Sequence, residues 1–196
     1  GSSISFMSDR TSNSILISSL NENIDKTLEI LQKKLFSPGF IEEDFDRLKK
    51  NKIQGEENIE KNRQSVGSRI FRKKIFGDNA YGGHPVKKDI KKIKIKDLQK
   101  YYETNYSPSV TDLVIVSQFS KEEILGKLDF LKKWKAKEVS IPSNFDFPKS
   151  EETQIYICDF PGATQSSVSI GHKSLKYDYN GETFKNKILN YPLGGS

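Results

Sequence analysis

Residues 105–123 read NYSPSVTDLVIVSQFSKEE, and this run joins the end of one helix, a strand and the start of a second helix. Leu113–Val116 is a short continuous apolar run, which predicts a strand buried on both faces. Ser120 and Glu123 have the spacing of a capping box, which predicts a helix that closes near Trp134. That helix is expected to turn three apolar side chains inward: Ile124, Leu128 and Leu131.

Before this run, the sequence predicts a hairpin and a helix. Residues 4–9 alternate apolar and polar side chains, residues 9–13 are typical of a turn, and residues 14–20 predict the returning strand. A helix is expected over residues 22–36, and Ser37-Pro-Gly39 stops it. Four apolar residues share one face of that helix: Ile24, Leu28, Leu31 and Leu35.

A second long helical segment starts near Ile41 and ends near Phe76. Its middle, residues 51–62, is strongly polar and contains Gly55, which predicts a kink or fraying there. Glycine and proline make residues 80–85 a loop, and a further helix is expected over residues 96–105.

Beyond residue 135 the pattern changes. Residues 136–153 carry prolines and charges without a sustained period, which is typical of a linker. Residues 154–160 and 166–171 predict two strands around a Pro-Gly turn, and residues 181–191 predict a final helix ended by Pro192. This order of elements indicates an α+β protein, with mostly antiparallel sheets flanked by helices.

Composition excludes several classes. Hydrophobic residues are 34% and charged residues 30%, and the net charge is +6, with lysine densest at residues 87–96. Acidic residues are interspersed throughout, so a solvated surface explains the lysines better than a nucleic-acid partner. No apolar run is long enough to span a membrane. No targeting signal is visible, so bacterial cytoplasm and periplasm both remain open.

Cys158 is the single cysteine, which excludes an internal disulfide. Its position in the middle of a predicted strand predicts a buried, inert thiol.

Three segments together resemble a known family. They are residues 105–123, residues 160–172 (FPGATQSSVSIGH) and residues 188–195 (ILNYPLGG). In this order they are similar to the pitrilysin/insulinase-like (M16) zinc metallopeptidases, which include the mitochondrial processing peptidases. The resemblance implies a first α+β domain of which residues 1–135 are the later two-thirds. It also implies an interdomain linker at 136–153 and the start of a second, similar domain at 154–196.

Family chemistry needs two histidines one helical turn apart, a glutamate base between them and a downstream glutamate as third ligand. The only histidines, His84 and His172, are far apart in the sequence. The resemblance therefore places the zinc helix before Gly1, or makes it absent from this half. Where the family's downstream acidic pair falls, this chain has Gln54 and Gly55.

Glu56 and Glu57 follow one and two residues too late, and each step along a helix turns a side chain by about 100°. The resemblance therefore favours a non-catalytic half, with no catalytic or metal-binding residue in this chain and zinc held by the catalytic half of the complete enzyme. A one-residue change of alignment would reverse that assignment. This chain alone is accordingly predicted to be inactive.

The family's glycine-rich segment faces the substrate chamber, and the resemblance carries it onto Gly194 and Gly195 as substrate-binding residues. An ordinary helix C-cap explains both glycines equally well. Pro192 departs from the aliphatic residue usual in the family and predicts an early helix end. The substrate-orienting arginine and tyrosine of the family are expected after Ser196.

Three functions remain open. The first is a supporting half that forms part of the peptide-binding chamber of a zinc peptidase, with a peptide or protein substrate and a homologous catalytic half or subunit as partners. The second is a downstream piece of the catalytic half itself. The third is a non-proteolytic assembly or binding module of the same fold. In each case exposed sheet edges predict that the chain self-associates.

Overall fold

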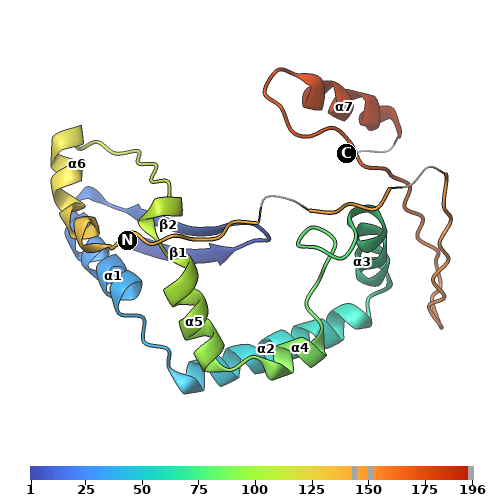
Figure 1. The fold of residues 1–196 in the computed structure, drawn as a ribbon, viewed down its shortest axis with the longest axis horizontal. Helices are drawn as coiled ribbons and strands as arrows, with labels where there is room; N and C mark the ends of the chain where they lie inside the picture. The colour runs from blue at the N-terminus through green and yellow to red at the C-terminus, as the bar shows by residue number, and fades with distance from the viewer. Residues whose placement is uncertain (143–144, 150–151, 194–196) are drawn as a thin grey trace. The chain divides into compact units, whose positions relative to one another are not determined.

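The computed structural model describes residues 1–142, 145–149 and 152–193 (Figure 1). The chain forms two compact units. The first combines Gly1–Asn58 with Pro85–Phe145, and the second combines Ile59–His84 with Asp146–Ser196. Helices and one antiparallel hairpin make up its regular elements within the described residues, which confirms the predicted α+β class.

The predicted hairpin opens the first unit. Strand β1 (Ser2–Ser8) pairs antiparallel with β2 (Asn13–Ser19), and Ile4 lies opposite Ile17. The turn between them is held by Asp9, whose carboxylate accepts hydrogen bonds from the backbone N–H groups of Thr11 and Ser12. These bonds favour the charged carboxylate, so they lower the pKa of Asp9.

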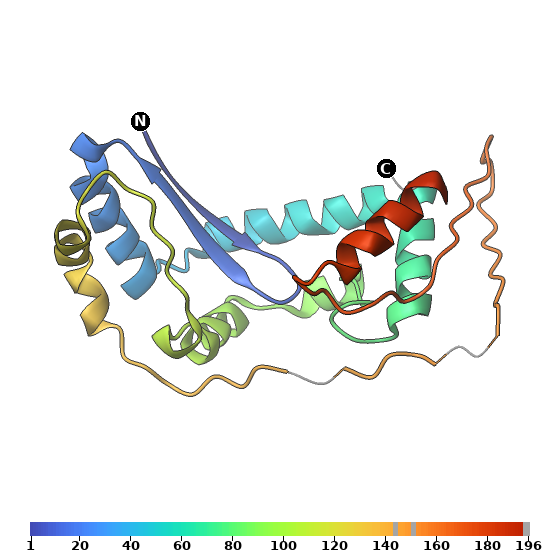
Figure 2. The same ribbon diagram turned by 90° about the horizontal axis from the view of Figure 1, so that it is seen from above.

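Helix α1 (Ile24–Phe36) follows a short 3₁₀ turn, η1 (Asn21–Asn23), and supplies the core of the first unit. Its face was predicted correctly: Leu28, Leu31 and Leu35 are buried. Leu28 and Leu31 cluster with Leu128, and hairpin side chains pack around them. Figure 2 shows α1 alongside the hairpin. The amphipathic stripe of α1 therefore joins the hairpin to the helix that follows the capping box.

The capping box at Ser120 is confirmed. The Ser120 hydroxyl accepts a hydrogen bond from the Glu123 N–H at 3.3 Å, and Glu123 Oε2 accepts one from the Ser120 N–H at 2.8 Å. These bonds start α6 (Lys121–Lys127), which continues into the 3₁₀ helix η3 (Asp129–Lys133). Lys127 forms an ion pair of 2.7 Å with Asp25 of α1. The ion pair and the burial of Leu128 hold α6 against α1.

The long second helical segment is two helices. Helix α2 (Glu42–Glu60) runs through Gly55 without interruption, and α3 (Arg63–Phe76) begins only after Asn62. A single glycine in a helix costs about 1 kcal/mol relative to alanine, which the rest of a long helix can offset. Asn62 then starts α3 by accepting a hydrogen bond from the Ser65 N–H at 2.9 Å.

Two further helices complete the first unit. Helix α4 (Lys87–Lys92) was not predicted, whereas α5 (Ile95–Asn105) matches the predicted helix. The Lys49 ammonium donates to the Ile93 carbonyl at 2.6 Å and thereby connects α2 to the segment between α4 and α5. A 3₁₀ turn, η2 (Pro108–Val110), follows α5.

The predicted strand at Leu113–Val116 is wrong. These described residues belong to no strand, and the side chains of Val114 and Val116 are 88% and 98% exposed. A strand buried on both faces needs hydrogen-bonded strands along its edges and packed elements over its two faces. Among the described residues the only sheet is the β1–β2 hairpin, so nothing there pairs with this run.

The strands predicted at 154–160 and 166–171 are wrong for the same reason. Neither segment joins a sheet, and Ile157 and Ile170 are 93% and 94% exposed. The Pro-Gly turn between them is present: the Ala163 N–H donates to the Phe160 carbonyl at 3.1 Å, and Gly162 has φ +79°. Local turn chemistry thus forms without the strand pairing.

The second unit is organised around the end of α3. The rings of Phe76, Tyr81 and Phe147 form a cluster with centroid separations of 5.9–6.3 Å. The Asn79 side chain donates to the carbonyls of Phe76 and Asp146 at 2.6 and 3.0 Å. Aromatic packing and one amide side chain therefore tie residues 76–81 to residues 146–147.

Candidate functional site

The two predicted substrate-binding residues, Gly194 and Gly195, lie outside the residues that the structure describes. The described chain leads to them through α7 (Glu182–Asn190) and the 3₁₀ turn η4 (Tyr191–Leu193). The α-helix ends before Pro192, as predicted, because proline has no N–H to donate.

The start of α7 is fixed by its own loop. Gly181 has φ +104°, and its N–H donates to the Asp178 carboxylate at 3.1 Å. The Thr183 hydroxyl accepts a hydrogen bond from the Asp178 N–H at 2.9 Å. These bonds order the turn that precedes the helix. Several apolar side chains of α7 and η4 remain exposed: Phe184, Ile188, Leu189 and Tyr191.

The carboxylates considered for a metal lie in α2 and face different surroundings. Glu56 is only 3% exposed, whereas Glu57 is half-buried and its carboxylate lies 4.0 Å from the Lys87 ammonium. Gln54, which stands at the family's acidic position, is exposed. Adjacent helix residues diverge, so this helix does not aim a pair of carboxylates at one point.

The histidines are exposed as well. His84 lies in the loop after α3, and His172 Nδ1 lies 2.7 Å from the Lys173 carbonyl oxygen. In the described part of the chain, no three His, Cys, Asp or Glu side chains gather into a group that could hold a metal. This donor set therefore does not fit zinc.

The thiol of Cys158 is exposed, so the predicted buried thiol is wrong. Its sulfur lies 3.8 Å from the Asp159 carbonyl oxygen. The prediction assumed a strand covered by neighbours, and residues 154–160 have no such cover in the structure.

Within the described residues, no helix combines the length and apolar character that a membrane crossing requires.

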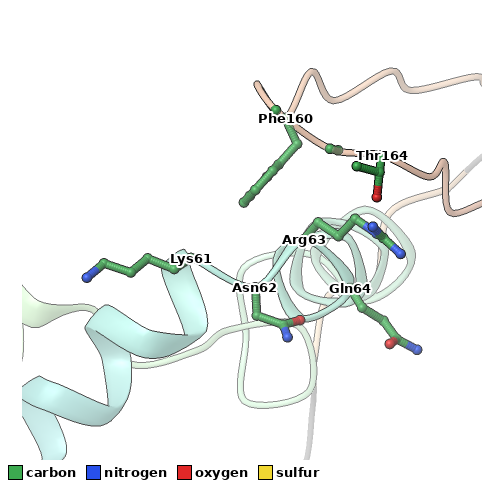
Figure 3. Close-up of a pocket in the computed structure, with 8 residues that line it drawn as sticks. Lys61, Asn62, Arg63, Gln64, Phe160 and Thr164 are labelled. Atoms are coloured by element: carbon green, nitrogen blue, oxygen red, sulfur yellow. The ribbon is translucent and has the colours of Figure 1, made fainter.

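A hollow of about 390 Å³ lies within the second unit, between the start of α3 and the Pro-Gly turn (Figure 3). Sequence reasoning missed it because the two segments are about a hundred residues apart in the chain. Each carried its own signal, a helix start and a turn. The hollow is lined by Lys61, Asn62, Arg63, Gln64, Phe160, Gly162, Ala163 and Thr164.

Arg63 is the most unusual side chain of this hollow. One of its terminal nitrogens, Nη2, donates to Gln165 Oε1 at 2.9 Å. Its Nε is buried and has no hydrogen-bond partner among the described residues. A buried donor without a partner carries a desolvation penalty. The guanidinium therefore has hydrogen-bonding capacity that the described chain leaves unused.

No curated protein matches the chain. The family model described as the peptidase M16 inactive domain matches residues 92–196, which is more than half of the chain. The match includes α5, the capping box and α6, the extended segments around the Pro-Gly turn, and α7. The chain therefore belongs to the M16 peptidase family, as a member that carries its inactive domain.

Proposed function

We propose that this chain is part of the supporting half of a pitrilysin-like zinc peptidase and that it forms a wall of the peptide-binding chamber. The match to the family's inactive domain carries this proposal. Zinc and the general base belong to a homologous catalytic half or subunit.

The proposed organisation follows the family's repeated α+β domains. Residues 1–135 are the later part of a first domain, residues 136–153 a linker, and residues 154–196 the beginning of a second. The described residues of the linker contain no helix or strand, which supports its assignment. This division concerns homologous repeats, and it differs from the division into compact units.

Substrate contact is proposed at Gly194 and Gly195. Glycine has no Cβ, so a peptide backbone can approach closely at these positions. The exposed apolar side chains of α7 and η4 immediately precede them. An apolar helix face next to a glycine pair supports a surface that a peptide covers.

The test uses the full-length protein, alone and mixed with its homologous catalytic subunit. We expect no zinc and no peptidase activity for the protein alone, and activity on mixing. One zinc per chain with activity alone would overturn the proposal and identify the catalytic half. In the active mixture, Gly194→Val and Gly195→Val should raise KM. Gly126→Ala, whose new Cβ meets no atom within 4 Å, is the matched control.

Assembly without proteolysis is the second candidate. The exposed apolar runs at 113–116, 155–157 and 168–170 favour it, because unpaired apolar segments pair readily with another chain. An inactive mixture that still forms a stable complex of defined stoichiometry would select this function over the first.

A further inference from the structure

The hollow at the start of α3 has a one-sided charge. Two of its eight lining residues, Lys61 and Arg63, are cationic, and none of the eight is acidic. Figure 3 shows Lys61 extending away from Arg63, whereas the Arg63 side chain lies on the side of Thr164. The Arg63 guanidinium is therefore the cation that faces the turn on the other side of the hollow.

The unused donor of Arg63 has a defined position. Nε and Nη2 lie on the same edge of a guanidinium group, and this edge matches the two oxygens of a carboxylate. Here Nη2 contacts the neutral amide oxygen of Gln165, while Nε has no partner among the described residues. Nη2 thus donates to one neutral oxygen, whereas a carboxylate offers two charged oxygens to Nη2 and Nε.

Gln165 is able to leave this edge. Its side chain is exposed, and it follows the Pro-Gly turn rather than lying in a helix or strand. When a carboxylate takes the place of the Gln165 amide, one hydrogen bond to a neutral oxygen is replaced by two hydrogen bonds between opposite charges. The exchange also satisfies the buried Nε, which removes its desolvation penalty.

The rest of the hollow suits a peptide side chain. The Phe160 ring points from the turn toward the start of α3, so it offers an apolar wall of the hollow (Figure 3). The positive end of the dipole of α3 adds to the attraction for an anion there. Thr164 supplies a hydroxyl on the opposite wall.

We propose that this hollow binds a carboxylate of an acidic peptide, with the Nε–Nη2 edge of Arg63 as its receptor and Gln165 as the group displaced. That the carboxylate belongs to a peptide rests on the proposed function. The hollow thereby selects peptides with an acidic residue, at a site distinct from the glycine pair at Gly194 and Gly195.

The experiment measures binding of short peptides to the chain itself, by calorimetry. The probes are acetyl-Ala-Phe-Glu-Ala-amide, its Gln analogue, and acetyl-Ala-Phe-Gln-Ala with a free C-terminus. We expect the Glu peptide to bind about tenfold more tightly than the amidated Gln peptide. Tight binding of the free-acid Gln peptide instead would assign the site to a C-terminal carboxylate and would overturn the selection of an acidic residue. Equal binding of all three overturns it.

Variants locate the site. Arg63→Gln should abolish the preference for the Glu peptide, and Arg63→Lys should retain only part of it because lysine lacks the planar fork. Arg72→Gln removes the same charge from the exposed side of α3 and should leave the preference intact. Gln165→Ala removes the competing amide and should tighten binding of the Glu peptide. A preference that survives Arg63→Gln overturns the proposal.

Inorganic phosphate also fits the planar fork of an arginine, so it is the competitor that tests the carboxylate assignment. Displacement of the Glu peptide by an equal concentration of phosphate would overturn that assignment. Two further outcomes separate this inference from the proposed function. Binding of the Glu peptide without activity in the reconstituted mixture would leave the site standing and refute the peptidase role. Activity without binding would do the reverse.

Discussion

The Ser107 hydroxyl is hydrogen bonded to both main-chain groups of Lys137: its oxygen accepts from the Lys137 N–H at 3.0 Å and donates to the Lys137 carbonyl at 2.9 Å. Ser107 is only 1% exposed and is the most completely buried side chain of the described residues. One hydroxyl therefore fastens the chain after α5 to the beginning of the proposed linker.

Replacing Ser107 should loosen this attachment. In Ser107→Ala the half-buried Lys137 N–H loses its partner, whereas the Lys137 carbonyl keeps the Ser109 hydroxyl. We therefore expect a loss of about 1–3 kcal/mol in the free energy of unfolding. Urea denaturation followed by circular dichroism measures it. Ser109→Ala is the control: its hydroxyl also donates to the Lys137 carbonyl, at 2.6 Å, but its side chain is exposed. Equal losses in the two variants would contradict the role of Ser107.

The capping box predicts a dependence of stability on pH. The Ser120 N–H, and next the Ser120 hydroxyl, donate to Glu123 and lower the pKa of its carboxyl group from 4.5. Since the folded pKa is below the unfolded one, this contribution to stability is present above pH 4.5 and is lost as pH falls through the folded pKa. We expect Glu123→Gln to lose stability less steeply than the wild type below pH 4.5.

The measurement is thermal unfolding from pH 6 to pH 2. Glu122→Gln removes the neighbouring carboxylate of the same first turn, and this side chain takes no part in the capping box. The thermal stability of that variant should fall with pH as steeply as that of the wild type. If Glu123→Gln leaves the dependence of thermal stability on pH unchanged, the capping box contributes nothing to the loss of stability in acid.

Helix α1 shows why the helices were predictable. Leu28, Leu31 and Leu35 recur at helical spacing, and the same three side chains are buried in the structure. That periodicity is local, so a short window of sequence contains it. The capping box at Ser120 is local in the same sense. In such elements the hydrogen-bond partners lie within the same short segment of sequence.

The strands and the site depend on distant partners. The apolar run at Val114 has the composition of a buried strand, but composition does not say which segment pairs with it. The Arg63 hollow joins the start of α3 to a turn about a hundred residues later in the chain. The buried Nε follows from that juxtaposition alone, so no motif in the sequence indicates it.

The exposed apolar runs predict self-association of the chain. Val116→Lys, Ile157→Lys and Ile170→Lys each place a charge on a side chain that is almost fully exposed, so folding should tolerate them. A lysine disfavours pairing of an apolar segment with another chain. Light scattering should therefore show a smaller mean mass for the triple variant. Ile41→Lys, which alters an isolated exposed isoleucine, should leave the mass unchanged. A monodisperse wild-type monomer would refute self-association.

Three glycines differ in backbone strain and in the steric contacts that a Cβ would make. Gly77 and Gly162 both have φ +79°, but a Cβ at Gly77 would lie 3.0 Å from Pro148 Cδ, whereas a Cβ at Gly162 would meet no atom within 4 Å. Gly162→Ala therefore reports the cost of the left-handed conformation alone, about 1–2 kcal/mol. Gly77→Ala should cost more for two reasons. Its φ of +79° is combined with ψ −163°, which is a conformation that essentially only glycine adopts, and the new Cβ would meet Pro148, which adjoins the Phe147 ring of the aromatic cluster.

Gly126 completes the set. It lies inside α6, and a Cβ there would meet no atom within 4 Å. Gly126→Ala should therefore stabilise the chain by about 1 kcal/mol, since alanine loses less conformational freedom in a helix. Urea denaturation of the three variants gives the order Gly126→Ala, Gly162→Ala, Gly77→Ala from most to least stable. Equal costs for Gly77→Ala and Gly162→Ala would contradict both the contact with Pro148 and the additional backbone strain at Gly77.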